Sequence, residues 1–248
     1  MIIDVHTHLG FDHCYGTDNP EAEFLYYQDL CKIDHAIIQP AVPLSHIEEN
    51  AAIHDKIYDF CKQHNGRFFG MASISPHFRP EVYEKELVRC VKELGFLGVK
   101  ITPAGHGINP AIKDIRYIYE ICRDLDIPVM IHTGSGTPFA DAINIYDIAK
   151  KFKDVKFIIA HAGGEACHGS AIHVAKLCDN VYLEPSWLMI LSLLGDIKAI
   201  GAERIMFSTD LALNAPVELA KYNALPISEE EREWLFCKTA KSVFKLNV

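Results

Sequence analysis

The sequence predicts an α/β fold, a single-domain (β/α)8 TIM barrel formed by residues 1–248. The chain has 248 residues, about the length of one such barrel. Eight short apolar runs recur along it, and stretches of helical periodicity lie between them. Near-continuous apolar strands separated by helices are typical of a parallel sheet covered on both faces, and eight such units predict closure into a barrel. A doubly wound open sheet is the alternative.

The predicted strands are rich in β-branched residues and recur at intervals of about one strand and one helix. They are residues 2–5, 36–39, 68–74, 98–101, 128–131, 156–160, 181–183 and 204–207. Helical periodicity separates them, for example at 47–63, 81–94, 112–125, 143–152, 190–200 and 229–244. No linker or low-complexity tract divides the chain, so we expect one domain.

Composition and charge exclude several classes of function. The chain has 24 basic and 33 acidic residues and a net charge of -9, which argues against a nucleic-acid partner because phosphate neutralisation needs clustered Lys and Arg. No apolar run approaches the roughly 20 residues of a membrane span, so we expect no membrane contact. The start of the chain lacks the features of a signal peptide, which predicts a cytoplasmic protein. The eight cysteines form no C-x-x-C pair and are expected to be reduced.

Metal-binding side chains stand where predicted strands end. His6 and His8 are two residues apart, so both project to the same side of their strand and can bind one ion together. His132 and Asp210 follow two later strands. A metal that activates water needs neutral imidazoles and a carboxylate, with one position left open. His161 follows another strand and is either a further ligand or a free imidazole that polarises substrate or moves a proton.

Four motifs in this order resemble the amidohydrolase superfamily, and in particular the compact branch called amidohydrolase family 2, which includes aminocarboxymuconate semialdehyde decarboxylase. They are the H-x-H of His6 and His8, Ile131-His132-Thr133-Gly134, Ala160-His161-Ala162-Gly163-Gly164 and Asp210. The resemblance covers nearly the whole chain. It implies a barrel of the metal-dependent hydrolase type.

The resemblance also implies roles for these residues. His6, His8, His132 and Asp210 would bind one divalent metal, commonly Zn2+ or another ion such as Mn2+, and His161 would be catalytic. Asp210 is well placed to accept a proton from the activated water, which makes it the second predicted catalytic residue.

The chemical state of Lys100 determines whether the site would hold one metal ion or two. In two-metal amidohydrolases a strand-four lysine is carboxylated and bridges the ions. An unmodified ammonium would instead repel a second cation and bind a substrate carboxylate. We expect one ion, with Lys100 as a substrate-binding residue.

Three further residues are predicted to contact substrate. His77 and Arg79 have the charge to hold a carboxylate. Glu184 ends the seventh strand with Ser186 and Trp187, and these three either line the pocket or only cap and pack. The expected partner is therefore a small molecule that carries a carboxylate, and a homodimer is expected by analogy with other barrels.

The leading functional hypothesis is a metal-dependent hydrolase that cleaves a C–O or C–N bond of a small acyl substrate through a metal-activated water. The alternative is a metal-dependent decarboxylase of an aromatic or unsaturated carboxylic acid, which would use the same ligands. A third hypothesis, a non-catalytic metal or metabolite binder, is weakened by the presence of both Asp210 and His161.

Overall fold

Residues 1–12, 14–42, 46–134 and 138–248 are described in a computed structural model of the chain. The strands are β1 (Ile3–Asp12), β2 (Thr17–Asn19), β3 (His35–Pro40), β4 (Phe68–Gly70), β5 (Ala72–Ser73), β6 (Val99–Ile101), β7 (Val129–His132), β8 (Phe157–Ala160) and β9 (Val181–Glu184). They form two sheets, of order β2-β1-β3-β4 and β5-β6-β7-β8-β9. Every pair except β1 with β2 is parallel.

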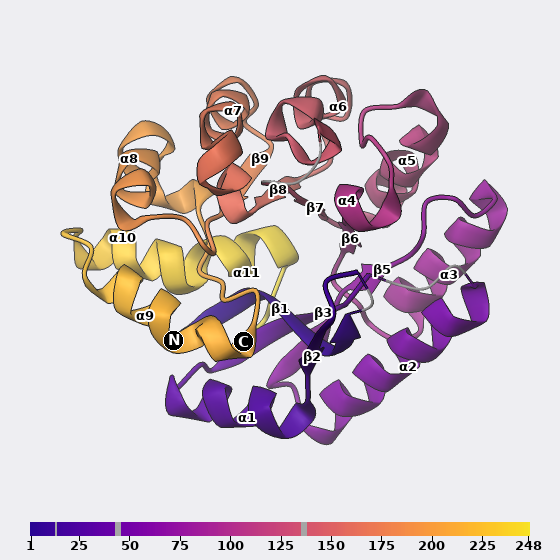
Figure 1. The fold of residues 1–248 in the computed structure, drawn as a ribbon, viewed down its shortest axis with the longest axis horizontal. Helices are drawn as coiled ribbons and strands as arrows, with labels where there is room; N and C mark the ends of the chain where they lie inside the picture. The colour runs from indigo at the N-terminus through magenta and orange to yellow at the C-terminus, as the bar shows by residue number, and fades with distance from the viewer. Residues whose placement is uncertain (13, 43–45, 135–137) are drawn as a thin grey trace.

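Helices follow the strands and enclose them (Figure 1). They are α1 (Glu21–Leu30), α2 (Ile47–Gln63), α3 (Pro80–Lys92), α4 (Pro103–His106), α5 (Arg116–Leu125), α6 (Tyr146–Lys151), α7 (Gly164–Leu177), α8 (Ile190–Ile200), α9 (Ala215–Asn223), α10 (Glu229–Glu233) and α11 (Thr239–Phe244). The helices predicted at 47–63 and 190–200 coincide with α2 and α8. None of the helices in the described parts of the chain is long and apolar enough to cross a membrane.

The third strand joins the two sheets. Sequence periodicity predicts one strand over 68–74, but the structure divides it into β4 and β5 at Met71. The Met71 backbone N–H donates to Ile38 O at 2.9 Å, whereas that of Ala72 donates to Gly98 O at 2.9 Å. The backbone therefore stops pairing with β3 and begins pairing with β6 at this point.

The eighth strand closes the ring. Residues 205–210 are not a regular strand, yet they bridge β9 and β1 through the pairs Leu183 with Ile205 and Thr7 with Asp210. The Asp210 N–H also donates to His6 O at 2.7 Å. Hydrogen bonds on both sides of this segment complete the predicted barrel, which is confirmed.

The apolar core has two parts. The larger cluster lies between strands and helices, and a smaller one contains side chains such as Val5, Ile37 and Met130 from the strands together with Val243 and Phe244 of α11. All five are almost fully buried. Rigid packing of this kind fixes the strands from which the candidate site is built.

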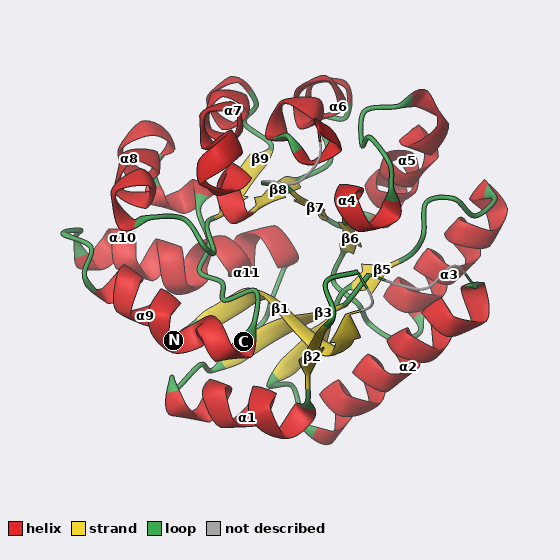
Figure 2. Cartoon of the chain, viewed as in Figure 1, coloured by secondary structure: helices red, strands yellow, loops and turns green. Residues whose placement is uncertain are grey.

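β1 is longer than the sequence predicts. It continues through the H-x-H motif to Asp12 and turns back as β2, with Gly10 opposite Asn19 and Asp12 opposite Thr17. The resulting antiparallel hairpin extends beyond the parallel strands (Figure 2). It carries polar side chains over the carboxyl-terminal end of the barrel, where barrel enzymes place their sites.

Candidate metal centre

Three side-chain atoms converge where β1 meets the eighth strand. His6 Nε2 lies 3.1 Å from His8 Nε2 and 3.2 Å from Asp210 Oδ1, and His8 Nε2 lies 3.4 Å from the same oxygen. Ligand atoms about 2.1 Å from an ion stand about 3.0 Å apart at right angles and about 3.4 Å apart at tetrahedral angles. The three atoms are therefore spaced as ligands of one divalent metal, and the predicted pairing of His6 with His8 on one side of the strand is present.

Hydrogen bonds fix which nitrogen of each histidine faces this point. His6 Nδ1 donates to Glu184 Oε2 at 2.7 Å, and His8 Nδ1 donates to the Gln39 carbonyl oxygen at 3.2 Å. A carboxylate and a carbonyl can only accept, so both protons sit on Nδ1 and both Nε2 atoms present a lone pair. Two lone pairs and a carboxylate oxygen directed at one another require a cation between them.

Lys100 supplies the positive charge nearest to these acceptors. Its Nζ donates to His6 Nε2 at 2.7 Å and its side chain is buried inside the barrel. Burial lowers the pKa of Lys100 to about 8, although Asp210 and Glu184 act in the opposite direction. The lone pair of His6 is thus satisfied by Lys100 in this structure, and a bound metal would take the place of that hydrogen bond.

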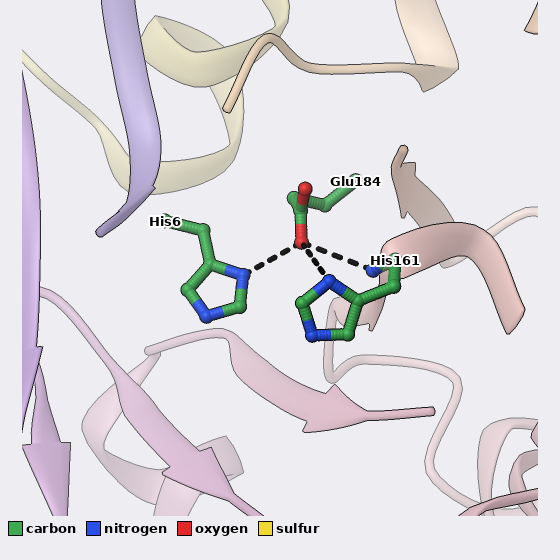
Figure 3. Close-up of side chains that lie close together, drawn as sticks. All are labelled: His6, His161 and Glu184. Atoms are coloured by element: carbon green, nitrogen blue, oxygen red, sulfur yellow. Dashed lines mark hydrogen bonds and ion pairs between the residues drawn. The ribbon is translucent and has the colours of Figure 1, made fainter. Parts of the chain in front are cut away.

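Glu184 is buried behind the donor cluster and does not line the cavity. Its carboxylate accepts from the His161 backbone N–H at 3.0 Å as well as from His6, as Figure 3 shows, and also from Ser186 N and Ser208 Oγ. Burial would raise the pKa of Glu184, but His6 and its other donors hold it well below the usual range. Glu184 is therefore held against His6 and the His161 backbone and does not reach the cavity in which the sequence predicted it to bind substrate.

The same carboxylate belongs to a second group of possible ligands, His6, His161 and Glu184. The oxygens of Glu184 are already occupied by hydrogen-bond donors, and all three residues are buried. The group of His6, His8 and Asp210 reaches the cavity and is the better metal site.

The protonation states of the histidines and of Asp210 suit a divalent metal. Burial lowers the pKa of His6 to about 3 and that of His132 well below its usual value. Burial likewise lowers the pKa of His161. For Asp210 burial acts upward, but the neighbouring His161, His6 and His8 hold its pKa well below the usual range. Neutral imidazoles and an ionised carboxylate are the protonation states that metal binding requires.

His132 and His161 form a second pair close to the donor cluster, with the ring centroids of His161 and His6 5.1 Å apart. His132 Nδ1 and His161 Nε2 are 3.1 Å apart, and His161 Nδ1 hydrogen-bonds Ser186 Oγ at 2.7 Å. Thr133 Oγ1 donates to Ala160 O and accepts from Gly163 N, which joins the ends of β7 and β8. Among the described residues, His132 belongs to none of the three groups whose donor atoms all lie within 4.8 Å of one another, so its ligand role stays a prediction.

Three loops at this end of the barrel adopt left-handed backbone conformations. The φ angles are +63° at His161, +66° at Trp187 and +63° at Asp210. Non-glycine residues adopt such angles in only a few per cent of cases, and strained backbone of this kind clusters at functional sites. Gly163 follows His161 with a φ of +84°, and a Cβ there would lie 2.9 Å from His168 N, so this turn requires glycine.

A cavity of about 320 Å³ opens beside the donor cluster. It is lined by side chains from the strand ends and from the β1–β2 hairpin: His8, Asp12, Tyr15, Thr17, Asn19, Val42, Lys100, Thr102, His132, Thr133, Gly134, His161, Gly164, Trp187, Asp210 and Leu211. Aromatic and polar walls together suit a small planar molecule with polar substituents.

Two predicted substrate-binding residues lie outside this cavity. His77 lines a separate cavity of about 450 Å³, and its Nε2 donates to the His106 carbonyl oxygen at 2.6 Å. Arg79 precedes α3 and lines neither cavity. The loop after the third strand therefore does not bring these cations to the metal centre.

Asp4 supports the site from within the barrel, although the sequence predicted no role for it. It is fully buried, and its carboxylate accepts from His6 N at 3.1 Å, from Thr209 N at 3.1 Å and from Thr209 Oγ1 at 2.6 Å. Asp4 thereby joins the two strands that carry the donors, and burial raises its pKa to about 7. A carboxylate within the apolar run of the first strand was the signal that could have revealed it.

The family model described as Amidohydrolase (Amidohydro_2) matches residues 3–246. The chain belongs to the amidohydrolase family. It is therefore an enzyme of this superfamily, as the motifs predicted.

Two named proteins are similar to this chain in sequence. A gamma-resorcylate decarboxylase from Polaromonas sp. (strain JS666) is 28% identical over 236 residues, which cover 73% of this chain and 71% of the decarboxylase. A 2-keto-4-carboxy-3-hexenedioate hydratase from Sphingobium sp. (strain SYK-6) is 36% identical over 100 residues, but the match covers only 32% of this chain and 29% of the hydratase.

Solved structures share the barrel. A dihydroxybenzoic acid decarboxylase from Polaromonas sp. JS666, crystallised with manganese and the inhibitor 2-nitroresorcinol, superposes with a TM-score of 0.81 at 18% identity, covering 100% of this chain and 97% of that one. At this identity the likeness establishes the fold.

Proposed function

We propose that this chain is a metal-dependent decarboxylase of a small aromatic carboxylic acid that carries a ring hydroxyl. The observation that carries the proposal is the convergence of His6, His8 and Asp210 within 3.4 Å of one another at the edge of a cavity. The decarboxylase names among the relatives support this reaction.

His6, His8 and Asp210 would hold one ion, with His132 as the predicted fourth ligand. Both Mn2+ and Zn2+ accept imidazole and carboxylate ligands. When bound, the ion supplies positive charge that anchors substrate oxygens and stabilises the negative charge of the reacting ring. Lys100 adds a second positive group to the cavity wall and suits a substrate carboxylate.

The reaction breaks the bond between the ring and the carboxyl carbon, releases carbon dioxide and adds a proton to the ring carbon. Asp210 is ionised at rest, so it can accept the proton of the ring hydroxyl and return it to the ring carbon. The electron pair of the broken bond then returns to the ring, and the phenolate product takes a proton from solvent. His161 faces the cavity as a neutral imidazole and can donate a hydrogen bond to the substrate.

The cavity limits the size of the substrate. A volume of about 320 Å³ accepts one substituted ring. Tyr15 and Trp187 provide aromatic walls, while Asp12, Thr17 and Asn19 offer hydrogen-bonding groups from the hairpin. Ring hydroxyls are the substituents that such groups recognise.

The test is carbon dioxide release from 2,6-dihydroxybenzoate by the protein reconstituted with Mn2+. We expect carbon dioxide and resorcinol in equal amounts, and loss of about 1,000-fold in kcat/KM for Asp210→Asn. A parallel panel of lactones and aryl esters tests the hydrolase alternative. Hydrolysis of that panel without carbon dioxide release from any hydroxybenzoate would contradict the proposal.

A further inference from the structure

Trp187 occupies an unusual backbone position at the edge of the cavity. It lies three residues after β9 with a φ of +66°, and its backbone N–H donates to Glu218 Oε1 at 2.9 Å. This turn places the indole so that Nε1–H donates to Asp210 Oδ2 at 2.7 Å. A left-handed angle at a bulky residue is costly and persists only where the surroundings enforce it.

The two oxygens of Asp210 have different partners. Oδ1 lies 3.2 Å from His6 Nε2 and 3.4 Å from His8 Nε2, whereas Oδ2 accepts from the Trp187 indole. An indole N–H is a donor only and carries no charge. It therefore occupies Oδ2 without neutralising the carboxylate, and it fixes the rotation that turns Oδ1 toward the histidines.

We propose that Trp187 is a positioning residue that keeps Asp210 bound to the metal through one oxygen, an inference that rests on the proposed function. A carboxylate that binds through both oxygens fills two coordination positions, whereas one held at Oδ2 fills a single position. By holding Oδ2, Trp187 would keep Asp210 to a single coordination position and so leave one available for the substrate. The indole also covers one wall of the cavity, and 52% of the residue remains exposed.

The chain provides a direct optical test, because it contains two tryptophans. Trp187 contacts a metal ligand, whereas Trp234 lies in the π-helical turn η7 (Trp234–Lys238) with Lys238 Nζ 5.6 Å from its ring. Paramagnetic Mn2+ quenches a neighbouring indole. Titration with Mn2+ alone should quench the emission of Trp234→Phe, which retains Trp187, and leave that of Trp187→Phe nearly unchanged.

Mn2+ affinity and kinetics complete the test. Trp187→Phe keeps the ring but removes the donor, so we expect Mn2+ to bind 10- to 100-fold more weakly and kcat to fall more than KM rises. Trp234→Phe is the matched control and should match the parent in both. Equal Mn2+ affinity and equal kcat for Trp187→Phe and the parent would overturn this inference while leaving the decarboxylase proposal intact. Failure of the parent to bind Mn2+ would overturn both.

Proton exchange tests the hydrogen bond without the Trp187→Phe variant. In Trp234→Phe, the remaining indole N–H resonance belongs to Trp187. We expect this proton to exchange with solvent at least 10-fold more slowly than that of a free indole, although the side chain is half exposed. Exchange at the free rate would contradict the contact on which the inference depends.

Discussion

β1 and β9 make opposite contributions to the same site. β1 brings two imidazoles, His6 and His8, whose Nε2 atoms face the metal position. β9 and the residues after it bring no metal ligand to that position. Instead, Glu184 hydrogen-bonds His6, Ser186 hydrogen-bonds His161, and Trp187 hydrogen-bonds Asp210. β1 provides two of the three ligands, whereas β9 and the residues after it orient groups on other segments, so substitutions in the two should differ in kind.

Removal of a β1 ligand should have the largest effect. His8→Ala removes one of three donors from the cavity edge, and we expect Mn2+ binding to be lost and kcat/KM to fall by about 1,000-fold or more. His8 is partly exposed, so the fold should remain. Calorimetric Mn2+ titration and circular dichroism check this. Normal Mn2+ affinity in this variant would place the metal elsewhere.

Substitution of the β9 carboxylate should weaken the site without removing it. Glu184→Gln leaves the metal ligands in place, but it sets a side-chain amide opposite the N–H donors of His6 and His161. We therefore expect Mn2+ affinity to fall by about 10- to 100-fold and the free energy of unfolding to fall by about 1–3 kcal/mol.

A second buried histidine–carboxylate pair provides the matched control. Glu86 accepts from His54 Nδ1 at 2.7 Å, the same distance as between Glu184 and His6, and lies outside the cavity. Glu86→Gln should lose comparable stability with unchanged Mn2+ affinity. An equal loss of affinity in both variants would show that general destabilisation, and not orientation of His6, explains the Glu184 effect.

The pH dependence of stability should reveal that His6 of β1 is buried and neutral. His6 has a pKa of about 3 in the folded protein and about 6.5 when unfolded, so the unfolded state binds more protons between these values. His6 therefore stabilises the fold above pH 6.5, and this contribution is lost as pH falls. Without metal, the unfolding free energy of the parent should drop between pH 6.5 and 4.5 more steeply than that of His6→Gln, by up to about 1.4 kcal/mol per pH unit. Parallel curves from denaturant titrations would contradict a buried neutral His6.

The smallest effect is expected outside both strands. His77→Ala and Arg79→Ala change residues that do not line the cavity, so kcat and KM for 2,6-dihydroxybenzoate should each change less than about twofold. A large rise in KM for either variant would show that the loop before α3 reaches the substrate.

The candidate metal ligands could be predicted from the sequence because only a few residue types bind divalent metals. The spacing of His6 and His8 places both on one side of a strand, and Asp210 ends the eighth apolar run. The barrel follows from apolar runs and helical periods, which depend on local sequence.

The orienting contacts could not be predicted in the same way. Glu184, Trp187 and Asp4 are ordinary residues locally, and their roles arise from contacts 178, 23 and 205 residues away in the chain. Pairing of this kind depends on the register of the closed barrel, which hydrophobic periodicity does not fix. His77 and Arg79 are the opposite case. Their residue types and their place after a strand predicted contact with substrate, yet neither residue lines the cavity.

The most direct test of this account is the metal content of the purified protein, measured by elemental analysis after reconstitution with Mn2+ and beside its intact mass under non-denaturing conditions. We expect about one ion per chain, none in His8→Ala, and no added mass of carbon dioxide on Lys100. No bound ion in the parent, or two ions with a carboxylated Lys100, would contradict the single-metal centre formed by His6, His8 and Asp210.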